Sequence, residues 1–201
     1  MEFKLEQALG NVRFNLIDTL EKSNKRRLIS FDNYEIKCKS GCSGCCKRLI
    51  KLTMAEAFII YEYLKSNDLW DKVKIKAEDQ LPTIKNSNDV TWFMMNKPCP
   101  VLNKHNNCLA YKVRPILCST HFVKSDPILC DPLNMDVGKY ESIQFNDFVE
   151  DFLKKLLKNT ALSGIFQLEL SLQESILLAE KINLQVGLDL DQIISLFFNE
   201  L

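Results

Sequence analysis

Residues 38–56 read CKSGCSGCCKRLIKLTMAE, so four cysteines fall within nine consecutive residues and a helix start follows them. Thiols at this density are hard to explain as core packing, because buried cysteines are usually scattered through a sequence. Cys42 and Cys45 have the two-residue spacing that lets two sulfurs of one turn reach a single metal, and Gly41 and Gly44 permit the tight turn. The stretch predicts a metal site that includes Cys38, Cys42, Cys45 and Cys46.

A second group of cysteines lies further along the chain, at Cys99, Cys108 and Cys118, and Cys130 follows them. The N-terminal residues 1–6 mix acidic with apolar side chains and lack the continuous apolar region of a signal peptide. We therefore expect a cytoplasmic protein without a membrane span, in a reducing compartment where disulfides are rare and thiols remain available as ligands.

The order of motifs carries a resemblance to a known family. The pattern C-x3-C-x2-C-C is followed by Cys99-Pro100, by Cys108, and by Y-x2-R-P-x2-C from Tyr111 to Cys118. This order resembles the YkgJ-type cysteine-cluster family, which implies a domain that chelates zinc or iron. The same module resembles part of the flagellin lysine N-methylases, which implies an iron–sulfur cluster. The chain departs from the pattern at Ser119, where family members often have Arg.

The cysteine count leaves two metals open. Four thiolates suffice for one iron–sulfur cluster such as [4Fe–4S], whereas eight cysteines also supply two tetrahedral zinc sites. Adjacent Cys45 and Cys46 would be strained as ligands of one tetrahedral ion and suit two metals or a multi-iron cluster better. We expect an iron–sulfur cluster, with zinc as the alternative. The expected ligands are Cys38, Cys42, Cys45, Cys46, Cys99, Cys108 and Cys118.

Other side chains of the module are candidates for supporting roles. Arg114 can donate hydrogen bonds to a cofactor or clamp a carboxylate, and a loop-pinning ion pair is an equal alternative. We expect Tyr111 to pack around the cofactor beside it. Cys130 is as much an unliganded thiol as a ligand. His121 reaches the metal of Cys118 only if that turn is helical, and His105 lies in a polar loop.

Apolar residues at three- and four-residue steps predict amphipathic helices on both sides of the cysteines. Such stripes occupy residues 5–20, 70–81, 145–156, 165–179 and 190–201. Thr53 and Glu56 form a capping box that predicts a helix at Met54–Lys65. Alternating patterns at Tyr34–Cys38 and Val90–Met94 indicate short strands.

The expected fold class is mainly α: a single-domain helical protein of residues 1–201 with a cysteine-rich metal-binding module and room for a short β-hairpin. Its parts are an N-terminal helix (1–30), the cysteine-cluster module (31–140) and C-terminal helices (141–201). We expect the C-terminal helices to pack on the module or on a second copy, so the pattern allows a homodimer.

Composition argues against some classes of function but does not identify a substrate. Lys plus Arg equals Asp plus Glu at 26 each, which argues against a nucleic-acid partner. No Walker loop, dinucleotide fingerprint or H-E-x-x-H is present, so catalysis is undecided. We expect a metal-binding protein whose iron–sulfur cluster serves electron transfer or an associated modification reaction, with an unidentified protein or redox partner. The alternatives are a lysine methyltransferase-like enzyme and a structural zinc scaffold.

Overall fold

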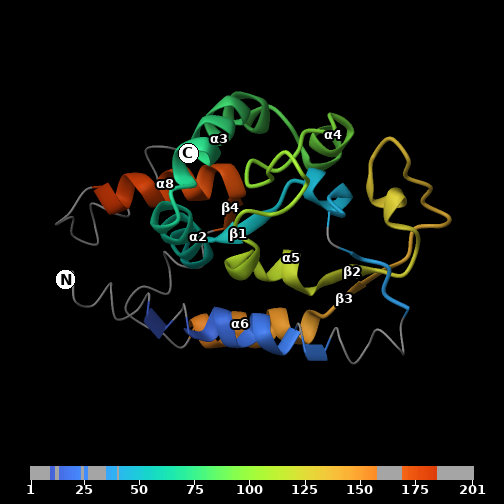
Figure 1. The fold of residues 1–201 in the computed structure, drawn as a ribbon, viewed down its shortest axis with the longest axis horizontal. Coiled ribbons are helices and arrows are strands. Elements are labelled where there is room, and N and C mark those ends of the chain that lie inside the picture. Colours follow the sequence, from blue (N-terminus) through green and yellow to red (C-terminus); the bar gives the residue numbers. More distant parts are fainter. Residues whose placement is uncertain are drawn as a thin grey trace.

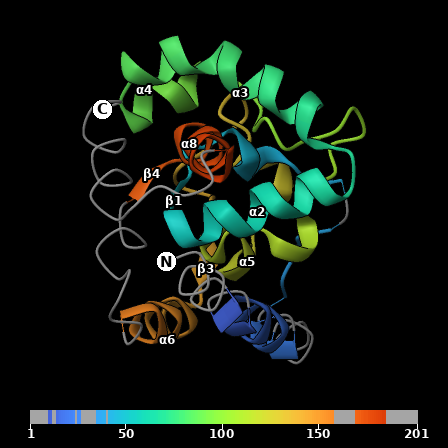
Figure 2. The same ribbon diagram turned by 90° about the vertical axis from the view of Figure 1, so that its left-hand side faces the viewer.

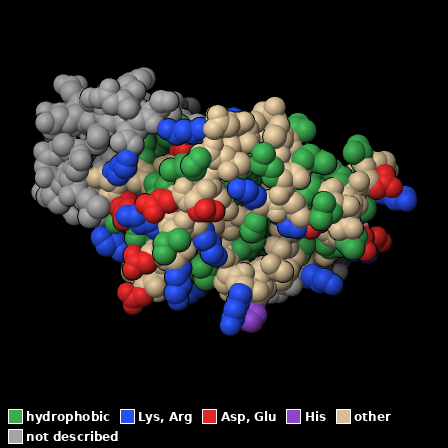
Figure 3. All heavy atoms as spheres, turned by 90° about the horizontal axis from the view of Figure 1, so that it is seen from above, with side chains coloured by type: hydrophobic (Ala, Val, Ile, Leu, Met, Phe, Trp, Pro, Cys, Tyr) green, Lys and Arg blue, Asp and Glu red, His purple; other side chains and the backbone are tan. Residues whose placement is uncertain are grey.

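The computed structural model of the protein describes residues 10–11, 14–23, 25–26, 35–39, 41–157 and 169–184. The fold is mainly helical, with two small antiparallel sheets in this part of the chain, as the sequence predicts (Figure 1). None of the helices in these ranges combines the length and the apolar character that a bilayer crossing needs. Positive and negative side chains are interspersed over the face seen in Figure 3.

An N-terminal helix covers residues 10–11, 14–23 and 25–26 of the described chain. The further elements, in chain order, are η1 (Gly44–Lys47), β1 (Lys51–Thr53), α2 (Met54–Ser66), α3 (Trp70–Lys85), α4 (Asp89–Met94), η2 (Tyr111–Val113), α5 (Ile116–Thr120), β2 (His121–Val123), η3 (Pro127–Cys130), β3 (Ser142–Gln144), α6 (Asn146–Leu157), β4 (Glu169–Ser171) and α8 (Leu172–Leu184).

The helices form the body of the molecule, and the second cysteine segment packs against it. Helix α8 lies between α2 and α3 and packs against both of them (Figure 2). The N-terminal helix runs beside α6, to which Lys155 connects it through Asp18 at 3.5 Å (Figures 1 and 2). Strands β2 and β3 and the loop between them form one end of the molecule (Figure 1).

Each small sheet joins segments that lie apart in the sequence. β1 pairs with β4, with Lys51 opposite Ser171, and so connects the residues after the first cysteines to the start of α8. β2 pairs with β3, with His121 opposite Gln144. The two ladders therefore hold the cysteine module against the C-terminal helices.

Helix α2 begins with the predicted capping box. The Glu56 amide donates to the Thr53 hydroxyl at 3.4 Å, and the Glu56 carboxylate accepts from the Thr53 amide at 2.9 Å. The second carboxylate oxygen accepts from the Ile116 amide at 2.8 Å. Glu56 is only 2% exposed, so one buried side chain satisfies the starts of both α2 and α5. This contact fixes the short helix that carries Cys118.

One buried apolar cluster connects most of the helices. It takes side chains from the N-terminal helix, α2, α3, α5, α6 and α8, with Leu16, Ile60, Val73, Phe152 and Ile176 among its fully buried members. A smaller cluster of Ile36, Phe122 and Phe145 lies under β2 and β3. The body of the protein thus has a core made of hydrocarbon side chains.

The predicted helices are confirmed where the structure describes them, except at residues 169–171, which form a strand. Met54–Ser66 matches the helix predicted from the capping box, and Trp70–Lys85 and Asn146–Leu157 match the second and third stripes. The stripe at residues 165–179 becomes strand β4 followed by helix α8, and its residues 165 and 168 lie outside the described chain. The predicted helix at residues 190–201 also lies outside it, as do residues 5, 9 and 12 of the first stripe.

Both predicted strands of the cysteine module are wrong. Residues 35–39 are irregular, and Lys37 makes a single bond to the Val123 carbonyl at 2.8 Å, which is too little for a ladder. Residues 89–94 form α4, because Asn88 caps the Thr91 amide at 2.8 Å. The alternating apolar residues there do not share a face: only Trp92 is buried.

Candidate metal centre

The first cysteine segment is irregular backbone followed by a tight 3-10 turn. Gly41 adopts φ +79, which an L side chain disfavours, and the Cys42 amide donates to the Lys39 carbonyl at 3.1 Å. η1 then places Cys45 and Cys46 in consecutive positions. Cys38 lies beside β2, where the Val123 amide donates to its sulfur at 3.3 Å.

Backbone contacts bring the second segment to the first. The Cys99 amide donates to the Cys46 carbonyl at 2.8 Å. Cys108 follows in the same loop, where its backbone pairs with Leu102, and Cys118 lies in α5. The seven cysteines expected as ligands form no disulfide, and each is partly exposed. The seven cysteines therefore lie in segments that are connected to one another, although these segments form several separate turns.

Cys130, in η3, also lies beside the first cysteine segment. A Cβ added at Gly44 would lie 2.6 Å from the Cys130 Cβ and 2.8 Å from its carbonyl carbon, so the two backbones touch. Lys47 and Asp131 form an ion pair beside this contact. Cys130 is itself 2% exposed. The structure thus places the thiol that the sequence left open against the first cysteine segment.

The adjacent thiols Cys45 and Cys46 interact directly. A hydrogen bond from the Cys46 thiol lowers the pKa of Cys45 to about 7, and the same contact raises the pKa of Cys46. Arg48 and Arg114 lower the pKa of Cys45 further through their charges. The lowered pKa favours the thiolate form of Cys45, which is the form that binds metal.

Burial has the opposite effect on the neighbouring thiols. It raises the pKa of Cys99 and of Cys130 to about 12, and it raises the pKa values of Cys42, Cys108 and Cys118 above their usual range. Thiols in apolar surroundings ionise only when a nearby cation compensates the charge. Metal binding at these residues must therefore displace protons, which makes it dependent on pH.

Two arginines supply fixed positive charge. Arg48 donates to the Tyr140 hydroxyl at 3.1 Å, and its guanidinium lies over the rings of Phe93 and Tyr140. Arg114 lies over the Tyr111 ring at 3.9 Å and donates to the Tyr111 carbonyl at 3.0 Å. The structure thus places Arg114 and Tyr111, the expected cofactor neighbours, in contact with each other. Arg48 lies two residues after Cys46, and no sequence motif indicated it as part of the site.

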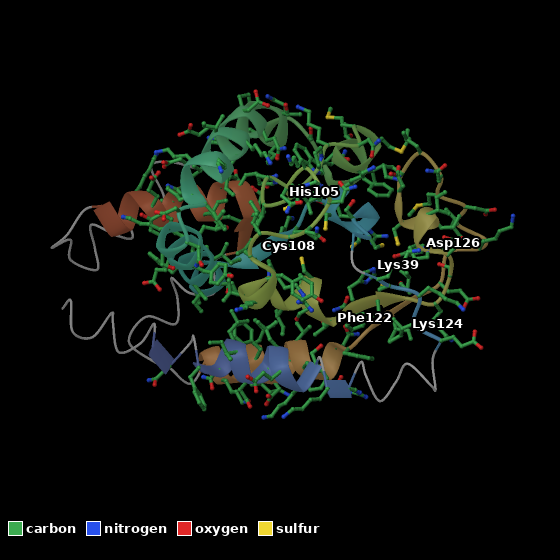
Figure 4. The ribbon with its side chains drawn as sticks, viewed as in Figure 1. Lys39, His105, Cys108, Phe122, Lys124 and Asp126 are labelled. Carbon is green, nitrogen blue, oxygen red and sulfur yellow. The ribbon has the colours of Figure 1, made fainter. Side chains whose placement is uncertain are left out.

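The two histidines contribute little to the donor set. His121 contacts the Tyr140 hydroxyl at 3.0 Å through Nε2 and the Gln144 amide oxygen at 3.3 Å through Nδ1. Both ring nitrogens are thus engaged with protein partners, and burial lowers the pKa of His121. His105 is exposed in its loop, and Figure 4 shows it apart from Phe122 and Lys124.

The donors fit a thiolate-bound metal by their chemistry. Soft sulfur ligands suit zinc and iron–sulfur clusters, whereas hard cations prefer oxygen. In the described ranges, no three His, Cys, Asp or Glu side chains already stand in an arrangement that could hold an ion. Loading therefore requires thiol side chains to turn toward the metal from the backbone positions that the contacts above fix.

These features define a mainly helical protein with a cysteine-rich metal-chelating centre. The family model CxxCxxCC, described as a putative zinc- or iron-chelating domain, matches residues 37–143. The match spans more than half of the chain, and the chain belongs to this family. It confirms the predicted cysteine-cluster resemblance and contains all eight cysteines. No curated protein and no solved structure matches the chain.

Proposed function

We propose that this chelating domain holds an iron–sulfur cluster that serves electron transfer or an associated modification reaction. The observation that carries the proposal is the set of thiols gathered around Cys45 and Cys46, together with the positive charges of Arg48 and Arg114, which lower the pKa of Cys45. A thiolate-ligated iron–sulfur cluster has such ligands, and charged groups and hydrogen bonds around it set its reduction potential.

The chain's own residues would tune the cluster in two ways. The Val123 amide donates to the Cys38 sulfur at 3.3 Å, and such bonds stabilise charge on a ligand. Arg48 and Arg114 add positive charge close to Cys45. Both effects favour the more negative state of a bound group, so they raise its potential relative to a site without them. The bound cluster supplies the one-electron chemistry.

A redox partner protein would meet the site at the loop between β2 and β3. Ile128, Leu133 and Val137 expose 57%, 73% and 83% of their surface there, next to Cys130. Apolar side chains exposed together are typical of a surface that a partner covers. This loop forms one end of the molecule in Figure 1.

A structural zinc scaffold is the second candidate, and one observation favours it. Cys42-x2-Cys45 spans the turn into η1, and a backbone hydrogen bond from Gly44 partly offsets the burial that raises the pKa of the Cys42 thiol. Amides directed at the sulfurs of a Cys-x2-Cys turn support zinc as well as iron.

Elemental analysis separates the two candidates. Protein purified without oxygen should be brown and contain iron with acid-labile sulfide, because thiolate-bound clusters absorb visible light. Reconstitution with iron and sulfide should restore the colour after it is lost in air. Colourless protein that contains zinc, and no sulfide after reconstitution, would establish the zinc scaffold instead.

A further inference from the structure

Five side chains form one chain of hydrogen bonds around strands β2 and β3. At one end, Arg48 donates to the Tyr140 hydroxyl at 3.1 Å, and this hydroxyl lies 3.0 Å from Nε2 of His121. At the other end, Nδ1 of His121 lies 3.3 Å from the Gln144 amide oxygen, and the Gln144 amide nitrogen donates to the Thr120 hydroxyl. The chain thus runs from the residue that follows η1 to the last residue of α5.

The direction of each bond follows from the groups that can only donate. A guanidinium has no acceptor atom, so the Tyr140 oxygen accepts from Arg48, and the single phenol proton is left for Nε2 of His121. Nε2 is then the unprotonated ring nitrogen, and Nδ1 carries the proton that the Gln144 oxygen accepts. The Thr120 hydroxyl, which accepts from Gln144, donates in turn to a carbonyl of its own helix at 2.7 Å. Each bond of the chain therefore has one donor and one acceptor only when His121 is the neutral Nδ1–H tautomer.

The surroundings of the two titratable groups favour the same protonation state. Burial and the positive charge of Arg48 lower the pKa of His121, so the ring is neutral near pH 7. Burial raises the pKa of Tyr140 although Arg48 lies beside it, so the phenol keeps its proton. Both nitrogens of the His121 ring are thus occupied within the protein, and neither presents a lone pair to a metal.

The chain also determines where the Arg48 guanidinium lies. Tyr140 holds one terminal nitrogen, and the central carbon lies 5.6 Å from the centre of the Phe93 ring and 5.4 Å from that of Tyr140. In this position the charge of Arg48 lowers the pKa of Cys45. The Nε–H of Arg48 is buried without a hydrogen-bond partner in the described part of the chain. Arg48 thus has a donor left for a negatively charged group, such as a metal-bound thiolate.

We propose that His121 is a positioning residue of the metal centre: it accepts the Tyr140 proton at Nε2, so that the Tyr140 oxygen faces Arg48 and holds its guanidinium beside the first cysteine turn. His121 itself does not bind the metal. The inference rests on the metal-binding function proposed above, and it holds for zinc as for an iron–sulfur cluster, since Arg48 acts by its charge on the thiolates of either group. Replacing a residue that orients such groups typically changes metal affinity by about 10- to 100-fold.

The tautomer is measured directly by ¹⁵N NMR of the full-length protein labelled at its histidines. A long-range ¹H–¹⁵N spectrum separates a protonated ring nitrogen from an unprotonated one and from one that binds a metal. We expect His121 to show the neutral Nδ1–H pattern both without metal and with zinc bound. A neutral Nε2–H pattern, or a zinc-bound nitrogen at His121, would overturn the proposal. His105→Gln assigns the signals, because the chain has only two histidines.

The zinc affinity of variants tests the positioning. Tyr140→Phe keeps the ring beside Arg48 but removes the hydroxyl, and His121→Leu removes the acceptor, so each should bind zinc about 10-fold or more weakly than the parent. His121→Gln should bind close to the parent affinity, because an amide has both an acceptor and a donor. Tyr61→Phe is the matched control, since it removes a hydroxyl that accepts from Lys65 in α2, and it should leave zinc affinity unchanged.

A double variant separates positioning from general stability. Once Arg48 is replaced by Met, Tyr140→Phe should cause little further loss of zinc affinity, because the hydroxyl acts through Arg48. Additive losses would contradict the proposal, as would parent-like affinity of both Tyr140→Phe and His121→Leu with the helical circular dichroism retained. The iron–sulfur proposal fails separately. Protein that binds zinc with these variant effects, but takes up no iron and sulfide on reconstitution, would end that proposal and leave the role of His121 standing.

Discussion

At the scale of single residues, positive charge and close packing define the centre. The chain has Ser119 where relatives of the sequence pattern often have Arg. Ser119 is fully buried, its hydroxyl donates to the Ile116 carbonyl at 2.8 Å, and its carbonyl accepts from Ser23 at 3.0 Å. An arginine would not fit this position. Arg48 and Arg114 supply positive charge near Cys45 from other positions.

Replacing Arg48 with Met should make metal release more sensitive to acid. Arg48 lowers the pKa of Cys45 and of Cys130, so its loss raises both values and lets protons compete at higher pH. We expect the midpoint of zinc release to rise by at most about one pH unit, with one unit corresponding to ~1.4 kcal/mol per thiol. Zinc release followed with a chromophoric chelator across pH measures the midpoint. Lys72→Met, which removes an exposed cation from α3, should leave it unchanged.

Gly44→Ala should separate η1 from η3. The added Cβ would lie 2.6 Å from the Cys130 Cβ and 2.9 Å from the Asp131 amide, and backbone cannot give way as a side-chain tip does. Overpacking of this kind costs about 1–3 kcal/mol. Urea unfolding should show that loss, together with weaker zinc binding. Gly10→Ala is the control, because nothing lies within 4 Å of its added Cβ. Equal stability of the two variants would show that Gly44 is not a required contact.

At the scale of elements, short segments are held in place by a few buried hydrogen bonds. Glu56 satisfies the starts of α2 and α5, and so determines where Cys118 lies. Helix α8 has the same arrangement, in which Ser171 and Glu174 cap its start. The difference is that Glu174 has no described bond to a cysteine-bearing element. Changes at the two capping boxes can therefore distinguish the effect of a cap on helix stability from its effect on the metal centre.

Glu56→Gln should weaken both the fold and the metal centre. The amide keeps one acceptor oxygen where the carboxylate had two, so either Ile116 or Thr53 loses its partner in a buried place. An unsatisfied buried group costs about 1–3 kcal/mol. Zinc affinity should fall along with the free energy of unfolding. Glu174→Gln should lower the free energy of unfolding and leave zinc affinity close to the parent value, and a matching loss of affinity would contradict this reasoning.

The elements also show what the sequence could predict and what it could not. The capping box at Thr53 and the stripe of Trp70, Val73 and Ala77 are local patterns, and the helices that they predict are confirmed. The alternation at Val90–Met94 is equally local, but the Asn88 cap outweighs it. The approach of Cys130 to Gly44 depends on η3 folding back from far along the chain, which no local pattern encodes.

At the scale of the whole molecule, the hydrocarbon core and the metal centre are distinct sources of stability. The main cluster spans the N-terminal helix, α2, α3, α5, α6 and α8, and Cys99 and Cys108 pack against it, whereas the first cysteine segment and η3 contribute no buried side chain to it. In a small zinc finger the metal replaces such a core, and removal of the metal unfolds the domain. This chain has enough buried apolar surface to fold around its own core.

Removing the metal from the whole protein should therefore disorder its cysteine-bearing end and spare the helices. Structural zinc in finger peptides contributes about 10–16 kcal/mol of binding free energy, comparable with the whole net stability of an ordinary domain, about 5–15 kcal/mol. That energy should be lost here mainly from residues 41–47 and 124–141, where few apolar side chains are buried. After chelation, circular dichroism should retain most of the helical signal, and limited proteolysis should cut within these two ranges before it cuts α2 or α8. Metal-loaded protein handled in the same way is the control, and it should resist cleavage in both ranges. A cooperative loss of the entire helical signal on chelation would mean that the metal centre supports the core, and that α2, α3 and α8 do not fold independently of it.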